Sequence, residues 1–203
     1  MQIFTDERTP DAAFEVFPDT ILTPIPLGEI FARPQPVEVD LGSGSGQFLI
    51  EASQRYPDHN FLGVERLLGR VRKTRRRAWK LGLQNLRVLR FEIDYTVRYL
   101  LPPGSIWRFH LSFPDPWPKR RHQRRRVVDQ AFFEAVHTAL QTRGELWIKT
   151  DHAEYFATIR KHVPQALFHL AEWVGDDYPS TDFEDLFALK QLPIYRLRLL
   201  KAN

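Results

Sequence analysis

The sequence contains no cysteine among its 203 residues. This absence excludes disulfide scaffolds, cysteine-ligated zinc, iron–sulfur clusters and any mechanism that uses a thiol nucleophile. A reducing cytoplasm is compatible with it, and we predict a cytoplasmic location. The sequence also lacks an apolar run of about 18 residues, so no membrane-spanning segment is expected. Residues 1–10 include two acidic side chains and no apolar core, so they do not resemble a secretory signal.

Proline is unevenly distributed along the chain. Six of the fifteen prolines fall within residues 1–36, which disfavours a long helix there. We therefore predict a proline-rich amino-terminal arm over residues 1–36, followed by one domain over residues 37–203. A hydrophobic content of 43% is enough for a sizeable core. The arm is expected to pack on the domain, because five of its apolar residues would be costly to leave in water: Phe14, Val16, Phe17, Ile21 and Leu22.

Positive charge is concentrated in two short segments. Residues 70–80 include seven basic residues and residues 119–126 include six, and neither segment contains an acidic residue. Outside these segments there are 16 basic and 25 acidic residues, a formal charge of 16 − 25 = −9, although the whole chain carries a net charge of +4. A net-acidic body with two cationic segments suggests directed contact with a polyanion. The alternative for each segment is a solvated helix face, and this is the simpler interpretation of residues 70–80.

From residue 37 onward, strand and helix patterns alternate. Short apolar runs predict strands over residues 37–41, 60–64, 86–91, 106–113 and 144–149. Apolar residues at helical spacing predict helices over residues 47–56, 67–81, 127–140 and 152–162. Two final strands, over residues 168–173 and 195–200, are expected to pair with each other. We predict an α/β fold with a mostly parallel, doubly wound sheet and an antiparallel C-terminal edge strand.

A glycine-rich turn joins the first predicted strand to the first predicted helix. It places glycines at Gly42, Gly44 and Gly46, which permit a tight turn and a close approach of the backbone to a ligand. The spacing differs from the dinucleotide fingerprint G-x-G-x-x-G. No G-K-[ST] follows, so phosphate-loop nucleotide hydrolysis is disfavoured.

Acidic residues end the next two predicted strands. Glu65 follows the second strand, where a carboxylate can accept hydrogen bonds from both hydroxyls of a ribose. Glu92 and Asp94 follow the third strand, where an acid can accept from an adenine amino group. Each also has a local interpretation, as a helix cap or a turn acid. Together with the glycine turn they favour an adenosine site, and the pattern resembles the class I methyltransferase fold that binds S-adenosylmethionine (SAM).

The fourth predicted strand leads into a segment that is rich in proline and arginine, Ser112–Arg126. Three of its prolines flank Asp115 and Trp117, and we expect them to hold the backbone extended. This would present an acid and an aromatic ring at the mouth of the sheet, followed by the cationic run. Trp117 is a candidate platform for an extruded base, with a lid over the cofactor or a core position as the alternatives.

These motifs together resemble the bacterial tRNA (guanine-N7)-methyltransferases. The resemblance extends from about residue 37 to the C-terminus, and the residues that carry it are Val39–Phe48, Gly63–Glu65, Phe113–His122, Lys149–Asp151 and Thr181–Glu184. It implies a Rossmann-like enzyme that transfers a methyl group from SAM to N7 of a guanosine in tRNA, at position 46 in the variable loop. The implied cofactor is SAM and the implied partner is tRNA, without a membrane or a metal.

The resemblance also assigns roles to individual residues. The residues at cofactor-binding positions are Asp40, Gly42, Gly44, Gly46, Glu65, Glu92 and Asp115, and Asp115 is also the catalytic residue. The residues at substrate-binding positions are Lys119, Asp151, Thr181, Asp182, Phe183 and Glu184. The residues at RNA-contact positions are Arg121, His122, Arg124, Arg125 and Arg126. The sequence departs from the family in having Asp at position 40, where Glu is more common, and Glu at position 92, where Asp is more common.

Methylation of guanine N7 is compatible with a protein that has no cysteine and several acidic residues at the predicted site. N7 has a lone pair and no proton, so its methylation requires alignment and desolvation and no general base. A carboxylate beside the ring stabilises the positive charge that the ring gains, and both Asp115 and Asp151 suit this role. Methylation of a pyrimidine at carbon 5 usually proceeds through a cysteine adduct, which this sequence excludes.

Two other functions remain open from the sequence. The first is methylation of an exocyclic amine of a nucleic acid, because Asp115-Pro-Trp117 partly matches the motif [DNS]-P-P-[FYW]. Trp117 stands where that motif has its second proline, which disfavours this function. The second is a non-catalytic RNA-binding module that kept the same fold.

Overall fold

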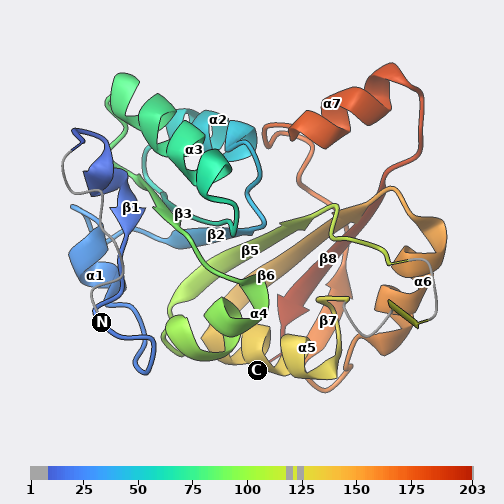
Figure 1. The fold of residues 1–203 in the computed structure, drawn as a ribbon. Coiled ribbons are helices and arrows are strands. Elements are labelled where there is room, and N and C mark those ends of the chain that lie inside the picture. Colours follow the sequence, from blue (N-terminus) through green and yellow to red (C-terminus); the bar gives the residue numbers. More distant parts are fainter. Residues whose placement is uncertain (1–8, 118–120, 123–125, 203) are drawn as a thin grey trace.

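A single eight-stranded sheet runs through the protein, in the order β1-β4-β3-β2-β5-β6-β8-β7. The computed structural model describes residues 9–117, 121–122 and 126–202 (Figure 1). The strands are β1 (Glu15–Val16), β2 (Val37–Leu41), β3 (Asn60–Val64), β4 (Leu86–Leu89), β5 (Ile106–Ser112), β6 (Leu140–Thr150), β7 (Phe168–Ala171) and β8 (Tyr195–Lys201). The first six strands in this order are parallel, and β8 and β7 are antiparallel to their neighbours. The predicted doubly wound sheet is therefore confirmed, with two antiparallel strands at its C-terminal edge.

Helices cover both faces of the sheet (Figure 1). On one face lie α2 (Gln47–Arg55), α3 (Leu68–Lys80) and α7 (Asp182–Leu189). On the other lie α4 (Ile93–Tyr95), the π-helical turn η2 (Thr96–Leu100), α5 (Gln130–Ala139) and α6 (Ala153–His162). None of the helices in the described ranges has the length and apolar composition that a bilayer crossing requires.

Each face of the sheet has its own apolar core, because side chains alternate between the faces along a strand. The larger core includes Phe109 of β5 with Phe132 and Phe133 of α5. The smaller core includes Leu49 of α2 and Phe61 of β3. All five of these side chains are almost fully buried, so burial of apolar area fixes the helices on the sheet.

The predicted element bounds differ from the observed ones mainly around α5 and β6. We expected a helix to start at residue 127, but α5 starts at Gln130 because Asp129 caps it. The Asp129 carboxylate accepts a hydrogen bond from the Phe132 N–H at 2.7 Å. The strand expected from residue 144 starts at Leu140, directly after α5.

The amino-terminal arm is built into the sheet and does not merely lie on it. It contains the 3₁₀ turn η1 (Ala12–Phe14), β1 and the short helix α1 (Leu27–Ile30), and β1 pairs in parallel with β4. Phe14 and Val16 are buried as expected. The expectation was wrong for Ile21 and Leu22, which are 38% and 84% exposed. They lie in an irregular bend, where the Leu22 N–H bonds the Thr20 hydroxyl instead of a neighbouring strand.

A buried arginine fastens the arm to α3. Arg75 lies within the cationic segment 70–80, yet it is only 3% exposed. Its guanidinium donates to Glu15 Oε2 at 2.6 Å, to Asp11 Oδ2 at 3.2 Å and to the Thr9 hydroxyl at 3.2 Å. One charge of this segment therefore faces inward and is paired with two carboxylates, as a buried charge requires.

The last glycine of the turn provides a test of the packing between α2 and α3. Gly46 has a φ of +76°, and a Cβ there would come within 2.2 Å of Thr74 Oγ1. We expect Gly46→Ala to lower the free energy of unfolding by about 2–4 kcal/mol, through the left-handed backbone and the overlap with Thr74. Urea denaturation measures this loss. Gly82→Ala is the matched control, because Gly82 has a φ of +63° and open space around it. If both variants lost the same free energy of unfolding, the loss would come from the left-handed backbone alone and not from overlap with Thr74.

Candidate active site

The order of strand addition reverses between β2 and β5. The chain adds β3 and β4 on one side of β2, and then returns to add β5 and β6 on the other side. Ligands of open α/β sheets bind at the carboxyl ends of the strands beside such a reversal. A cavity with two lobes opens at this place.

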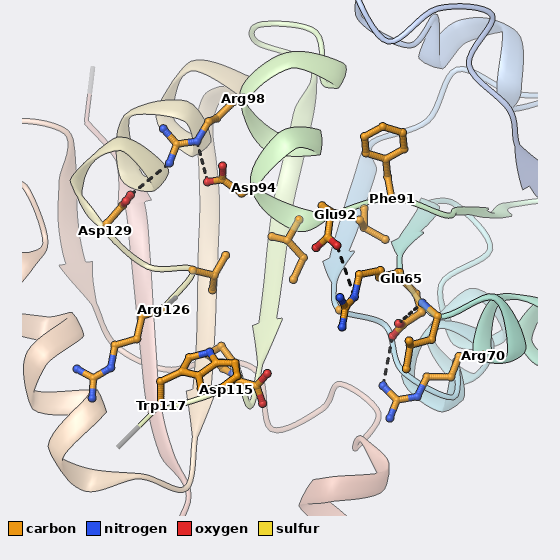
Figure 2. A pocket seen from close by; sticks show the side chains of 17 residues that line it. Glu65, Arg70, Phe91, Glu92, Asp94, Arg98, Asp115, Trp117, Arg126 and Asp129 are labelled. Carbon is orange, nitrogen blue, oxygen red and sulfur yellow. Dashed lines mark hydrogen bonds and ion pairs between the residues drawn. The ribbon is translucent and has the colours of Figure 1, made fainter. Parts of the chain in front are cut away.

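The two lobes share a wall. The residues that line both are Gly42, Glu65, Arg70, Ile93, Pro114 and Asp115. The first lobe has a volume of about 560 Å³, and Glu92, Asp94 and Trp117 also line it (Figure 2). The second lobe has a volume of about 430 Å³ and is also lined by Asp40, Gly44, Phe113 and Thr181–Phe183. Volumes of this size are typical of small-molecule sites, so the cavity has room for two adjacent ligands.

Glu65 organises the glycine turn. It is 6% exposed, and its Oε2 accepts a hydrogen bond from the Gly44 N–H at 3.0 Å. Its Oε1 accepts from the Leu67 N–H at 2.8 Å, and Arg70 lies 3.5 Å from Oε2. A carboxylate has about four acceptor positions, so Glu65 keeps capacity for a ligand hydroxyl.

Asp40 lies at the second lobe and is 5% exposed. Burial raises the pKa of Asp40 to about 7; nearby Lys149 opposes this rise and the charge of Glu65 adds to it. The carboxyl group therefore changes its protonation state near neutral pH. A cationic ligand beside it would favour the ionised form.

The acids that follow β4 lie at the rim of the first lobe. Glu92 forms an ion pair with Arg66 at 3.5 Å, and its side chain is 63% exposed. Asp94 is paired with Arg98 at 2.7 Å (Figure 2). Among the residues that the structure describes, no cluster of three or more His, Asp or Glu side chains has the arrangement of a metal site.

The loop after β5 carries Asp115 to the shared wall. We expected an extended backbone through this loop, but this is wrong at Phe113 and Trp117, whose φ angles of 54° and 39° are left-handed. Both residues precede a proline, which favours an extended backbone at the residue before it, so the left-handed φ is unfavourable there. Left-handed non-glycine residues are strained, and such strain clusters at functional sites. Figure 2 shows Asp115 and Trp117 across the opening from Glu65 and Arg70.

In the described part of the second cationic segment, some side chains face solvent and others face the protein. Arg121 is exposed, and the ring of His122 lies edge-on to Trp117 at 5.8 Å. Arg126 is half-buried; its Nε donates to the Pro116 carbonyl at 2.8 Å and its guanidinium lies 4.6 Å over the Tyr155 ring. Arg126 therefore holds the Asp115 loop in place. The other predicted residues of this segment, Lys119, Arg124 and Arg125, lie outside the described residues.

The segment Thr181–Glu184 forms the start of α7. The Thr181 hydroxyl accepts from the Glu184 N–H and the Glu184 carboxylate accepts from the Thr181 N–H, which is a capping box. Glu184 is buried and also pairs with buried Lys149 at 2.9 Å. The resemblance assigned this segment to the substrate alone. The spacing Thr-x-x-Glu is also a signature of a helix start, and sequence reasoning missed it.

The amino-terminal end of α7 closes the second lobe against the glycine turn. Asp182 accepts a hydrogen bond from Ser45, and Asp185 accepts one from Gln47 at 2.9 Å. Phe183 is 52% exposed, and its ring lies 5.7 Å from that of Phe113.

Three of the described residues that were predicted to bind cofactor or substrate are not among those that line the cavity. Asp151 is exposed after β6, Gly46 packs against Thr74, and Glu184 is buried against Lys149.

A buried polar cluster beside the cavity was not predicted. Glu38, two residues before Asp40, is fully buried and contacts four side chains: His110 at 2.6 Å, His59 at 2.5 Å, the Tyr178 hydroxyl at 2.9 Å and Arg108 at 3.3 Å. The signal was present as polar residues at alternate positions of β2 and β5. The cluster joins these strands to the loop that precedes α7.

Comparisons with known proteins agree with this geometry. A family model described as a putative methyltransferase matches residues 34–197. A tRNA (guanine-N(7)-)-methyltransferase of Macrococcus caseolyticus is 32% identical over 174 residues, which cover 82% of each chain. The chain belongs to this family of methyltransferases.

Other family members differ in length. A tRNA (guanine-N(7)-)-methyltransferase of Thermus thermophilus is 37% identical over 133 residues, which are 66% of this chain and 43% of that relative. The chain thus matches less than half of this longer family member. Among solved structures, the 16S rRNA methyltransferase KamB has a TM-score of 0.64 at 11% identity, covering 87% of this chain and 93% of that one. This likeness shows the class I methyltransferase fold.

Proposed function

We propose that this protein transfers the methyl group of SAM to N7 of a guanosine in tRNA, at position 46 in the variable loop. One observation carries the proposal: Asp115 stands on the wall between two adjoining lobes in a member of this family. The names of the M. caseolyticus and T. thermophilus relatives support tRNA as substrate. Such a substrate implies a cytoplasmic location.

The donor groups fit SAM bound across the shared wall: Glu92 lines the first lobe, Asp40 and Gly44 line the second, and Glu65 and Gly42 line both. Glu65 would bind the ribose hydroxyls, and Glu92 would accept from the adenine amino group. Asp40 would face the cationic, amino-acid end of the cofactor. Gly42 and Gly44 let the backbone approach it closely, and both have positive φ angles, 86° and 56°. When bound, SAM supplies a methyl group on a sulfonium.

Asp115 would act on the guanine, which would lie beside the cofactor in the part of the second lobe that Phe113 and Phe183 line. Its carboxylate stabilises the positive charge that the ring gains as N7 is methylated, and no proton has to be removed from N7. The exposed position of Asp151, outside the residues that line the cavity, supports Asp115 for this role. Arg121 and His122 would contact the tRNA backbone, together with Arg124 and Arg125, and Lys119 would bind the substrate guanosine.

Nucleoside analysis tests this function directly. Unmodified tRNA is incubated with the protein and methyl-labelled SAM, and the RNA is digested to nucleosides. We expect labelled 7-methylguanosine from position 46. A label on an exocyclic amine would identify the alternative methyltransferase. Binding of tRNA without affinity for SAM would identify an RNA-binding module.

The protonation of Asp40 predicts a pH dependence of cofactor binding. The carboxyl group is mostly protonated below its pKa of about 7, whereas the cationic end of SAM favours the ionised form. The dissociation constant for SAM should therefore rise by up to about tenfold per pH unit as the pH falls below 7. Calorimetry from pH 5.5 to 8.5 measures it. Asp40→Asn should bind weakly and without this dependence, and a wild-type pH profile in that variant would contradict the assignment.

A further inference from the structure

The first cationic segment divides into an inner and an outer face on α3. Arg75 faces inward to the arm, with Val71, Thr74 and Ala78 buried beside it. On the opposite side, three exposed basic residues follow one another at helical spacing: Lys73, Arg76 and Lys80. Residues three and four apart lie on the same face of a helix, so these three form a single stripe. We call it the α3 stripe.

The α3 stripe is not the usual charged face of a solvated helix. Such faces alternate acidic and basic residues, which stabilise each other at a spacing of four. α3 contains no acidic residue, and no ion pair of Lys73, Arg76 or Lys80 occurs among the described residues. Like charges at this spacing repel each other and destabilise the isolated helix. A bound polyanion would remove this repulsion.

The α3 stripe is continuous with the rim of the cavity. Arg66, just before α3, and Arg70, in its first turn, line the first lobe, and the stripe continues from there along the outside of the helix. Lys73 and Lys80 are separated by about 10 Å along the helix axis, so the stripe is long enough to contact more than one phosphate of a strand. On the opposite side of the opening from Arg70 lies Trp117 (Figure 2), and the ring of His122 contacts it at 5.8 Å.

We propose that the α3 stripe is a second tRNA-binding surface, which holds the phosphate backbone while Arg121 and His122 hold it on the other side of the cavity. This inference rests on the proposed function, because it takes tRNA as the polyanion. The tRNA then straddles the cavity and its guanosine enters between the two contacts. The stripe contributes affinity and no chemistry, because its residues do not line the cavity.

The test is a triple variant, Lys73→Gln with Arg76→Gln and Lys80→Gln. Its tRNA affinity is measured by filter binding from 50 to 200 mM salt, beside wild-type protein. Each lost phosphate contact flattens the slope of log affinity against log salt by about 0.7–0.9, so we expect a slope smaller by about 2–3. At physiological salt the affinity should fall by about 10- to 100-fold. The dissociation constant for SAM and the single-turnover rate at saturating tRNA should be unchanged.

A second triple variant is the matched control. Arg33→Gln, Arg55→Gln and Arg143→Gln also remove three exposed charges, but at the opposite, amino-terminal edge of the strands. An equal loss of affinity in this control would overturn the proposal, because the effect would then reflect net charge. An unchanged salt slope in the α3 variant would overturn it as well. The proposal would also be overturned if the α3 variant lost binding to phosphatidylserine vesicles and kept its tRNA affinity, because the stripe would then bind a membrane surface.

The two proposals fail separately. If wild-type protein forms no 7-methylguanosine but its tRNA affinity depends on Lys73, Arg76 and Lys80, the proposed reaction is wrong and the surface stands. If the reaction proceeds and the α3 variant keeps the wild-type salt slope, the surface is wrong and the reaction stands.

Discussion

Asp115→Asn should lower the single-turnover rate of tRNA methylation by about 10²–10³, with SAM and tRNA both saturating. Removing one preorganised electrostatic group from an active site typically has an effect of this size. The substitution keeps the shape of the side chain and removes its charge. The carboxylate lies on the wall that both lobes share, where the positive charge would move from the sulfonium to the guanine in the proposed reaction. The affinity for tRNA should be nearly retained, so the loss appears in the rate.

Two further substitutions make this result specific to Asp115. Asp58→Asn removes an exposed carboxylate near the amino-terminal end of β3, away from the cavity, and should keep the wild-type rate. Asp151→Asn tests the other acid that the sequence left open, and we expect a much smaller effect than at Asp115. A wild-type rate in Asp115→Asn together with a large loss in Asp151→Asn would transfer the role to Asp151.

Sequence reasoning succeeded where the signal is local. Residues 37–41 and 60–64 have the apolar composition of buried parallel strands, and β2 and β3 occupy those positions. The order of the elements then determines which strand ends meet at the cavity. For this reason the sequence alone predicts that Glu65, Glu92 and Asp115 lie together, and all three line the first lobe.

Sequence reasoning failed where the environment of a side chain depends on segments that are distant in sequence. Arg75 and Arg126 occur in cationic runs that suggest exposure, yet both face the protein. The partners of Arg75 are Asp11 and Glu15, which lie 64 and 60 residues away in sequence, and a charge count along the chain does not show them. The left-handed backbone at Phe113 was also missed, because the prolines of that loop suggest only extended chain.

The buried cluster around Glu38 predicts the largest effect on stability. Glu38→Ala should lower the free energy of unfolding by about 3–5 kcal/mol, because it leaves the Arg108 charge, His110 and the Tyr178 hydroxyl without their shared acceptor. Arg108 would remain buried, stacked 4.1 Å from the Trp147 ring, with Glu145, 3.4 Å from its Nε, as its remaining carboxylate partner. Urea denaturation at pH 7 measures the loss. Glu51→Ala, an exposed change on α2, is the control and should change stability by less than about 0.5 kcal/mol.

The pH dependence of stability identifies the ionised carboxylate as the cause. Burial alone would raise the pKa of Glu38, but hydrogen bonds from His110 and His59 and the charge of Arg108 hold this pKa well below 4.5. A carboxyl group with a lowered pKa in the folded state stabilises the protein above its unfolded value, and this contribution is lost as the pH falls. Burial also lowers the pKa of His110 below 6.5, so its contribution is likewise lost on acidification. The contribution of His110 should therefore be lost from about pH 6.5 downward and that of Glu38 below pH 4.5. Asp40 acts in the opposite direction between pH 7 and 3.8, because its pKa is raised in the folded state. The contribution of Glu38 is therefore measured as the difference between wild-type protein and Glu38→Ala. Glu38→Ala lacks the carboxylate and should show a flatter profile below pH 4.5. A variant that loses stability with the wild-type slope there would show that Glu38 is not the group being titrated.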